Sequence, residues 1–148
     1  MEFAGEQKLQ AQRANVFNAL LNPEVLKKSI PSCQGAEYVE LPEGRFLKIT
    51  VNVNVAILNG TYDIYLHATE IQEPSHLAIE AEPQNSLGKV ATRCVIDLAD
   101  DAAGTLLSYN VNAALSGKLA AVPEFAIKPA VKGMLDQFFK NFEKQIPA

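Results

Sequence analysis

The sequence has no tryptophan, and only two histidines and two cysteines among its 148 residues. Cys33 and Cys94 form neither a CxxC pair nor a disulfide framework, so we expect two reduced thiols in a cytoplasmic protein. Neither thiol has a base beside it in the sequence to activate it as a nucleophile. His67 and His76 lack neighbours at metal-ligand spacing, which favours surface histidines over a metal site.

Long apolar runs and excess positive charge are missing as well. No segment approaches the roughly 18 uncharged apolar residues of a membrane-spanning helix, and the first twelve residues lack the apolar core of a signal peptide. The formal net charge is −4 and the pI is about 5.2, whereas nucleic-acid binding needs a basic surface. We therefore expect no nucleic-acid partner, and peripheral contact with the inner face of the membrane stays open.

No catalytic constellation stands out. The carboxylates are scattered over outward strand positions and turns, without a pair set apart for acid–base work. The glycines occur about one per turn and form no phosphate-binding loop. Arg93 and Asp97 share the outward side of one strand and suggest a surface ion pair of little energetic worth. We expect no catalytic residue, no cofactor and no metal, and hence a protein that is not an enzyme.

The chain is long enough for one domain, which we expect to span residues 1–148, and its composition is that of a globular protein: 48% hydrophobic and 20% charged. A weakly alternating strand at residues 2–10 is followed by short helices at 11–21 and 23–29. Asn22 and Pro23 predict the start of the second helix, because asparagine caps helices and proline suits the first helical position.

Six further segments alternate apolar and polar residues with a period of two, as antiparallel strands with one wet face do. They cover residues 36–41, 46–55, 61–71, 76–81, 89–98 and 105–115. Short turns join them, which predicts a meander, and we expect residues 83–88 to be a loop.

The last segment, residues 119–146, places its apolar residues on one helical face and predicts a long amphipathic helix. A long helix covering one face of a curved antiparallel sheet of about seven strands is the expected α+β fold. Pro123 and Pro129 fall inside this segment, and a proline within a helix costs about 3 kcal/mol. Either the helix begins near one of them or it is kinked between them. The alternative is a mobile apolar lip at the cavity mouth, formed by Leu119, Val122, Phe125 and Ile127.

The space between the sheet and this helix is either filled or a cavity. Candidate lining residues are the inward-facing Val51, Val53, Tyr62, Ile64, Ile79, Cys94, Tyr109, Phe125, Met134 and Phe138. Among the inward hydroxyls, those of Tyr62, Thr92 and Tyr109, each is expected to bond to backbone or water, unless one orients a ligand head group.

The final segment also carries a stripe of lysines on an acidic protein. A solvated helix face is the default explanation of such a stripe. The alternative is a membrane or partner surface formed by Lys118, Lys128 and Lys132, with about 1 kcal/mol per lysine from anionic lipid.

Short motifs recur in order along nearly the whole chain. They are Asn22-Pro23-Glu24-Val25-Leu26, Ile30-Pro31-Ser32-Cys33, Asn59-Gly60-Thr61-Tyr62, Gly104-Thr105-Leu106-Leu107-Ser108-Tyr109, Gly117-Lys118-Leu119-Ala120 and Gln137-Phe138-Phe139. The ordered set resembles the CoxG family of carbon monoxide dehydrogenase subunits, within the helix-grip superfamily of START-like, polyketide cyclase and pollen-allergen proteins (SRPBCC). Ser32 stands where that family usually has glycine.

This resemblance implies a helix-grip fold with a hydrophobic cavity for a lipid or quinone. It also implies an accessory role beside a molybdenum hydroxylase such as carbon monoxide dehydrogenase, in membrane recruitment or in electron delivery. Two alternatives remain. One is a protein with a filled core that docks a partner through residues 30–33 and the final helix. The other is an enzyme like the cyclases and hydrolases of the superfamily, which needs titratable groups converging in the cavity.

Overall fold

A computed structural model describes residues 1–54 and 58–146, so the predicted inward position of Val55 lies outside the described residues. Seven strands form one antiparallel sheet in the order β1-β7-β6-β5-β4-β3-β2. Consecutive strands from β2 to β7 pair with each other, and β1 pairs with β7, which confirms the predicted meander. The strands are β1 (Glu2–Leu9), β2 (Cys33–Leu41), β3 (Gly44–Val53), β4 (Gly60–Gln72), β5 (His76–Asn85), β6 (Gly88–Asp101) and β7 (Gly104–Gly117).

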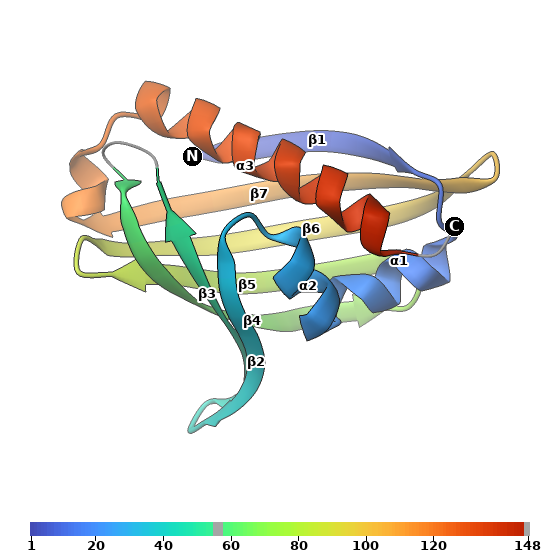
Figure 1. Cartoon of the computed structure of the whole chain (residues 1–148), viewed down its shortest axis with the longest axis horizontal. Helices are drawn as coiled ribbons and strands as arrows, with labels where there is room; N and C mark the ends of the chain where they lie inside the picture. The colour runs from blue at the N-terminus through green and yellow to red at the C-terminus, as the bar shows by residue number, and fades with distance from the viewer. Residues whose placement is uncertain (55–57, 147–148) are drawn as a thin grey trace.

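The helices lie together on one face of the curved sheet (Figure 1). They are α1 (Arg13–Leu20), α2 (Pro23–Ser29), the 3₁₀ helix η2 (Lys118–Ala121) and the long α3 (Glu124–Gln145). The Asn22 side chain caps α2 by accepting a hydrogen bond from the Glu24 amide at 2.9 Å. The Asn141 side-chain amide donates to the Ser29 carbonyl at 3.0 Å and ties α3 to the end of α2. The expected α+β arrangement, with two short helices after the first strand, is confirmed.

The start of α3 resolves the question of the two prolines. Pro123 is the residue before the first turn, with φ −70° and ψ 148°, and α3 runs from Glu124. Pro129 lies inside the helix, where it leaves the Phe125 carbonyl without an amide donor one turn later. The preceding residues form η2, whose Leu119 is buried. The helix therefore begins after Pro123 and continues past Pro129.

The predicted loop at residues 83–88 is wrong. Strand β5 continues through Pro83 to Asn85, and β6 already begins at Gly88. A strand tolerates proline where its missing amide is not needed. Here the pairing of β5 with β6 passes from Ala81–Thr92 directly to Gln84–Lys89, so residues 82 and 83 have no partner in β6. Pro83 pairs only with Ile64 of β4.

The core consists of two neighbouring clusters under the helices. The first surrounds Phe17 of α1 and Phe142 of α3, which are 1% and 0% exposed. The second lies against α2, β3 and β4 and contains Leu26, Ile49 and Tyr62. Phe138 of α3 packs against both clusters. The C-terminal half of α3 therefore packs tightly on the sheet, while its N-terminal half covers a less filled region.

Candidate functional site

A cavity of about 220 Å³ lies between the sheet and the first half of α3. Its side chains come from Met1, from six strands, from Leu58, and from η2 and α3. They belong to Met1, Phe3, Val51, Val53, Leu58, Tyr62, Ile64, Pro83, Val90, Thr92, Val111, Ala113, Leu115, Leu119, Ile127, Val131 and Met134. Apart from two hydroxyls, these side chains are apolar, and such a surface favours a hydrocarbon over water.

Half of the lining residues proposed from the sequence lie at this cavity. They are Val51, Val53, Tyr62, Ile64 and Met134. The strand alternation indicated the correct face for them, and Met134 follows Ile127 and Val131 on one side of α3.

The other five proposed residues do not line it. Ile79 and Cys94 are register partners on β5 and β6, and both pack in the first core cluster. Tyr109 lies over Gly5 of β1 and stacks on Phe139, with ring centroids 5.6 Å apart.

The remaining two are on α3. Phe138 packs between Phe139 and Phe142, at centroid distances of 5.1 and 5.3 Å. Phe125 is 81% exposed and points away from the core. The helix turns by about 100° per residue, so Phe125 cannot share a face with Ile127, which is 4% exposed.

The missed lining residues carry a recognisable signal. Val111, Ala113 and Leu115 continue the inward alternation of β7 toward its last residues, and Leu119 follows directly in η2. The cavity lies at the end of the sheet where β7 passes into the helices, whereas Tyr109 lies farther back. Selecting the lining residues from the sequence also required the distance of each inward residue from the end of β7.

Both hydroxyls of the cavity are already hydrogen-bonded. The Tyr62 hydroxyl donates to the Leu58 carbonyl at 2.9 Å. Burial raises the pKa of Tyr62, and a hydrogen bond with the Asn85 side chain lowers it by a smaller amount. The Thr92 hydroxyl donates to the Val90 carbonyl at 3.3 Å. These bonds agree with the expectation that hydroxyls inside the sheet bond to the backbone.

The two cysteines are protonated at neutral pH. Burial raises the pKa of the Cys94 thiol to about 11. Burial also raises the pKa of Cys33, and this effect exceeds the lowering by a backbone hydrogen bond from Gly35 and by the Lys27 charge. Because the thiolate is the nucleophilic form, neither cysteine is activated.

The opposite face of the sheet carries charged side chains that pair with each other. His76 lies between two carboxylates, with Nδ1 2.7 Å from Asp97 and Nε2 3.0 Å from Glu70. Arg93 binds Glu70 at 2.7 Å, so the expected Arg93–Asp97 pair is wrong. Residues four apart on a strand are about 13 Å apart, whereas neighbours across strands are about 5 Å apart.

Among residues 1–54 and 58–146, no three His, Cys, Asp or Glu side chains are grouped to hold a metal ion.

An open hollow of about 1060 Å³ also lies on that face. Glu80 on its wall is 3.6 Å from His67 and 3.9 Å from Arg93, and Glu82 is 3.5 Å from Lys89. Glu80 and Glu82 are thus each paired with a basic side chain, and the apolar cavity on the helical face is the stronger candidate site.

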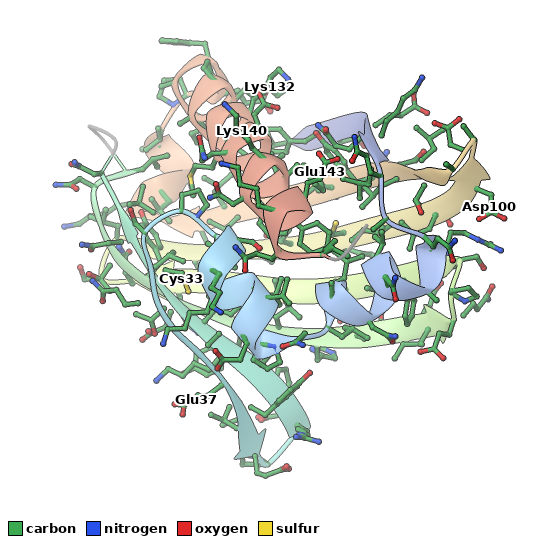
Figure 2. All side chains as sticks on the ribbon, turned by 45° about the vertical axis from the view of Figure 1, so that its right-hand side comes forward. Cys33, Glu37, Asp100, Lys132, Lys140 and Glu143 are labelled. Atoms are coloured by element: carbon green, nitrogen blue, oxygen red, sulfur yellow. The ribbon has the colours of Figure 1, made fainter. Side chains whose placement is uncertain are left out.

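The lysines of the proposed membrane or partner surface are exposed, but two have carboxylate neighbours. Lys128 is 3.9 Å from Glu124 and Lys132 is 3.6 Å from Asp136, while Lys118 begins η2. Figure 2 shows Lys132 on the outer side of α3, with Lys140 and Glu143 farther along. The positive potential along α3 is therefore weaker than the lysine stripe alone predicts. None of the helices in the described part of the chain is long and apolar enough to cross a membrane.

Comparisons with known proteins identify the fold and a family. The sequence matches the CoxG family of carbon monoxide dehydrogenase subunits over residues 5–147, and it matches no curated protein. A conserved protein from Geobacillus kaustophilus is 26% identical, with a TM-score of 0.87 over 98% of this chain and 94% of that chain.

Two more distant structures share the fold. A START superfamily protein from Mycobacterium smegmatis is 14% identical, with a TM-score of 0.70 over 98% of this chain and 96% of that one. The di-domain ARO/CYC protein StfQ of the steffimycin biosynthetic pathway is 8% identical, with a TM-score of 0.70 over 97% of this chain and 49% of that one. The architecture is therefore the helix-grip fold of START-like and cyclase proteins, as the sequence predicted.

Proposed function

The chain belongs to the CoxG family of carbon monoxide dehydrogenase subunits, and on this basis we propose that it is an accessory protein that binds a lipid or a quinone. The observation that carries the proposal is the apolar cavity of about 220 Å³ between the sheet and α3. Burial of apolar ligand surface there supplies the driving force, at about 25 cal/mol per Å² before the entropic cost of binding.

The chemistry around the cavity supports binding rather than catalysis. Acid–base or nucleophilic catalysis needs titratable groups with matched pKa values at the reacting atoms. The cavity side chains named above are apolar apart from Tyr62 and Thr92, whose hydroxyls bond to the backbone. We therefore propose that the protein is not an enzyme, unlike the cyclases that share its fold.

Family membership supplies the biological setting of the proposal. The partner enzyme is a molybdenum hydroxylase of the carbon monoxide dehydrogenase type, and the protein serves it by recruitment to the membrane or by delivering electrons to a quinone. Phe125 is exposed at the start of α3, near Ile127 in the cavity wall. This exposed apolar side chain, on the side of α3 that faces away from the cavity, supports peripheral contact with a membrane that holds the ligand.

The direct test is native mass spectrometry of the protein purified from its own host, followed by organic extraction of the bound compound. We expect a quinone or lipid at near one-to-one stoichiometry. A protein that arrives empty and also rejects added quinones and fatty acids contradicts the proposal. That result favours the partner-docking alternative, which a pull-down for a molybdenum hydroxylase then examines.

A further inference from the structure

The polar groups along the cavity are hydrogen-bonded within the protein. The Tyr62 hydroxyl donates to one backbone carbonyl and the Thr92 hydroxyl to another. The ammonium group of Met1 donates one of its three N–H groups to the Ala113 carbonyl at 3.2 Å. A ligand head group placed among the cavity side chains would lose its hydrogen bonds to water and find both hydroxyl protons engaged, which costs free energy. The side chains of the described lining residues thus offer an entering group apolar contact rather than hydrogen-bond donors.

The size of the cavity points the same way. Pockets that enclose a whole drug-sized molecule have about 300–1,000 Å³, and an apolar cavity of about 150 Å³ is enough for benzene. At about 220 Å³, this cavity accommodates one segment of a lipid or quinone and leaves the remainder outside.

Building on the proposed function, we infer that the cavity takes the hydrocarbon chain of its ligand and leaves the polar head group outside, in solvent. The protein then selects a chain of suitable length and shape, and compounds with different head groups on the same chain bind alike.

The surroundings of the cavity suit an external head group. On the helical side, Leu119, Ile127 and Val131 line the cavity, and each is followed or preceded in the chain by an exposed lysine. Charged side chains therefore lie next in sequence to the apolar wall residues. A head group beside them keeps its water and its hydrogen bonds.

Two series of probes in isothermal titration calorimetry test this inference. The first compares a benzoquinone without a side chain with the same benzoquinone carrying a decyl chain. The second compares decanol, decanoate and decyltrimethylammonium below their micelle-forming concentrations. We expect the benzoquinone without a chain to bind at least about 100-fold more weakly than its decyl derivative, and the three other decyl probes to agree within about tenfold.

Chain length gives an independent measurement. Each methylene buried contributes about a fourfold gain in affinity. We expect this increment per carbon along a series of alkanols until the chain fills the cavity, and a plateau beyond that length. A head group buried in the cavity predicts instead a strong dependence on the head group and a weak dependence on the chain.

A matched pair of variants on β7 locates the binding site. Ala113 lies in the cavity wall, whereas its neighbour Ala114 is exposed on the opposite face of the sheet. We expect Ala113→Leu to fill part of the cavity and lower decanol affinity at least about tenfold, because the chain loses several methylene contacts. Ala114→Leu adds the same side chain outside and is expected to leave decanol affinity unchanged. Circular dichroism and the unfolding midpoint check that both variants are folded.

The outcomes separate this inference from the proposed function. If the benzoquinone without a chain binds as tightly as its decyl derivative, or if affinity follows the head group, chain-selective binding is overturned while hydrophobic ligand binding stands. Equal loss of affinity in Ala113→Leu and Ala114→Leu also overturns it, because binding is then not in this cavity. If no quinone, alcohol or fatty acid binds at all, the proposed function fails together with the inference.

Discussion

Ser32 adopts an unusual backbone conformation in the turn between α2 and β2. It has a φ of 56°, in the left-handed region where a Cβ atom is unfavourable and glycine is not. The resemblance to the CoxG family led us to expect glycine at this position. The structure gives the physical reason: the chain turns sharply between α2 and β2, and the Ser32 carbonyl accepts a hydrogen bond from the Asn52 amide at 3.1 Å.

We therefore expect Ser32→Gly to increase the free energy of unfolding by up to about 1 kcal/mol. Relief of the left-handed strain outweighs the greater entropy that glycine gives the unfolded chain. Urea unfolding of the wild type and the variant measures the difference. Ser86→Gly is the matched control, because Ser86 lies in a turn without a positive φ, and there glycine should only destabilise. Equal destabilisation in both variants would contradict the strain at Ser32.

His76 gives the second prediction at the scale of one residue. The hydrogen bonds that His76 donates to the carboxylates of Asp97 and, to a smaller extent, Glu70 raise the pKa of His76, and the hydrogen bonds that Glu70 accepts from His76 and Arg93 lower the pKa of Glu70. The stabilisation from His76 is complete below its unfolded pKa near 6.5 and is lost as the pH rises through the higher folded value. The stabilisation from Glu70 is present above its unfolded pKa and is lost as the pH falls through the lower folded value.

An NMR titration of the His76 ring protons measures this directly. We expect a midpoint above 6.5 in the wild type and a lower midpoint in Asp97→Asn, because the neutral amide no longer favours the imidazolium. The loss of stability as the pH rises above 6.5 should be smaller in the same variant. An unchanged midpoint in Asp97→Asn would show that the Asp97 contact does not form in solution.

At the scale of elements, the sequence predicted which face of each strand is buried better than where each strand ends. Alternation is a local property, so Tyr62 and Ile64 could be assigned to the helical face directly. Strand ends depend on the partner strands. Pro83 looked like a loop residue because proline lacks a backbone amide. In the structure it pairs with Ile64 of β4 and has no partner in β6, so β5 can include it although it cannot donate a hydrogen bond.

Pro129 makes α3 weaker at the end that covers the cavity. It lies beyond the first turn of the helix, where its ring removes a hydrogen bond to the Phe125 carbonyl and crowds that carbonyl. We expect Pro129→Ala to stabilise the protein by about 1–3 kcal/mol, measured by urea unfolding.

Pro123 provides the control for this prediction. It precedes the first turn of α3, where the amide of the replacement residue has no partner within the helix. Pro123→Ala is therefore expected to change stability much less than Pro129→Ala. If the two variants behave alike, proline is not what limits the stability of this end of α3.

At the scale of the whole molecule, the fold could be predicted while the position of the cavity could not. The order of elements and the amphipathic final segment require a sheet covered by a helix. Whether a given inward residue meets a cavity or a core cluster depends on where the helix crosses the sheet. Tyr109 and Val111 face the same way on β7, yet Phe139 fills the space over Tyr109 and the cavity lies over Val111.

The distribution of charge over the whole molecule sets how it can approach a membrane. The protein has a net charge of −4 and is repelled by anionic lipid as a body, so contact requires its exposed lysines and Phe125 to face the bilayer. Each lysine near an anionic surface contributes about 1 kcal/mol. Glu124 and Asp136, the neighbours of Lys128 and Lys132, reduce this contribution.

We expect cosedimentation with vesicles containing phosphatidylglycerol at low salt, and weaker binding as salt screens the charges. Lys128→Gln and Lys132→Gln should each lower the partition coefficient by up to roughly fivefold, and Phe125→Ser should lower it further because an inserted aromatic ring is lost. Lys140→Gln is the matched control, since it removes the same charge farther along α3, past the cavity. If all three lysine variants lower binding equally, the contact depends on net charge alone. If none lowers it, this end of α3 does not face the membrane, and ligand exchange has to take place through a partner protein.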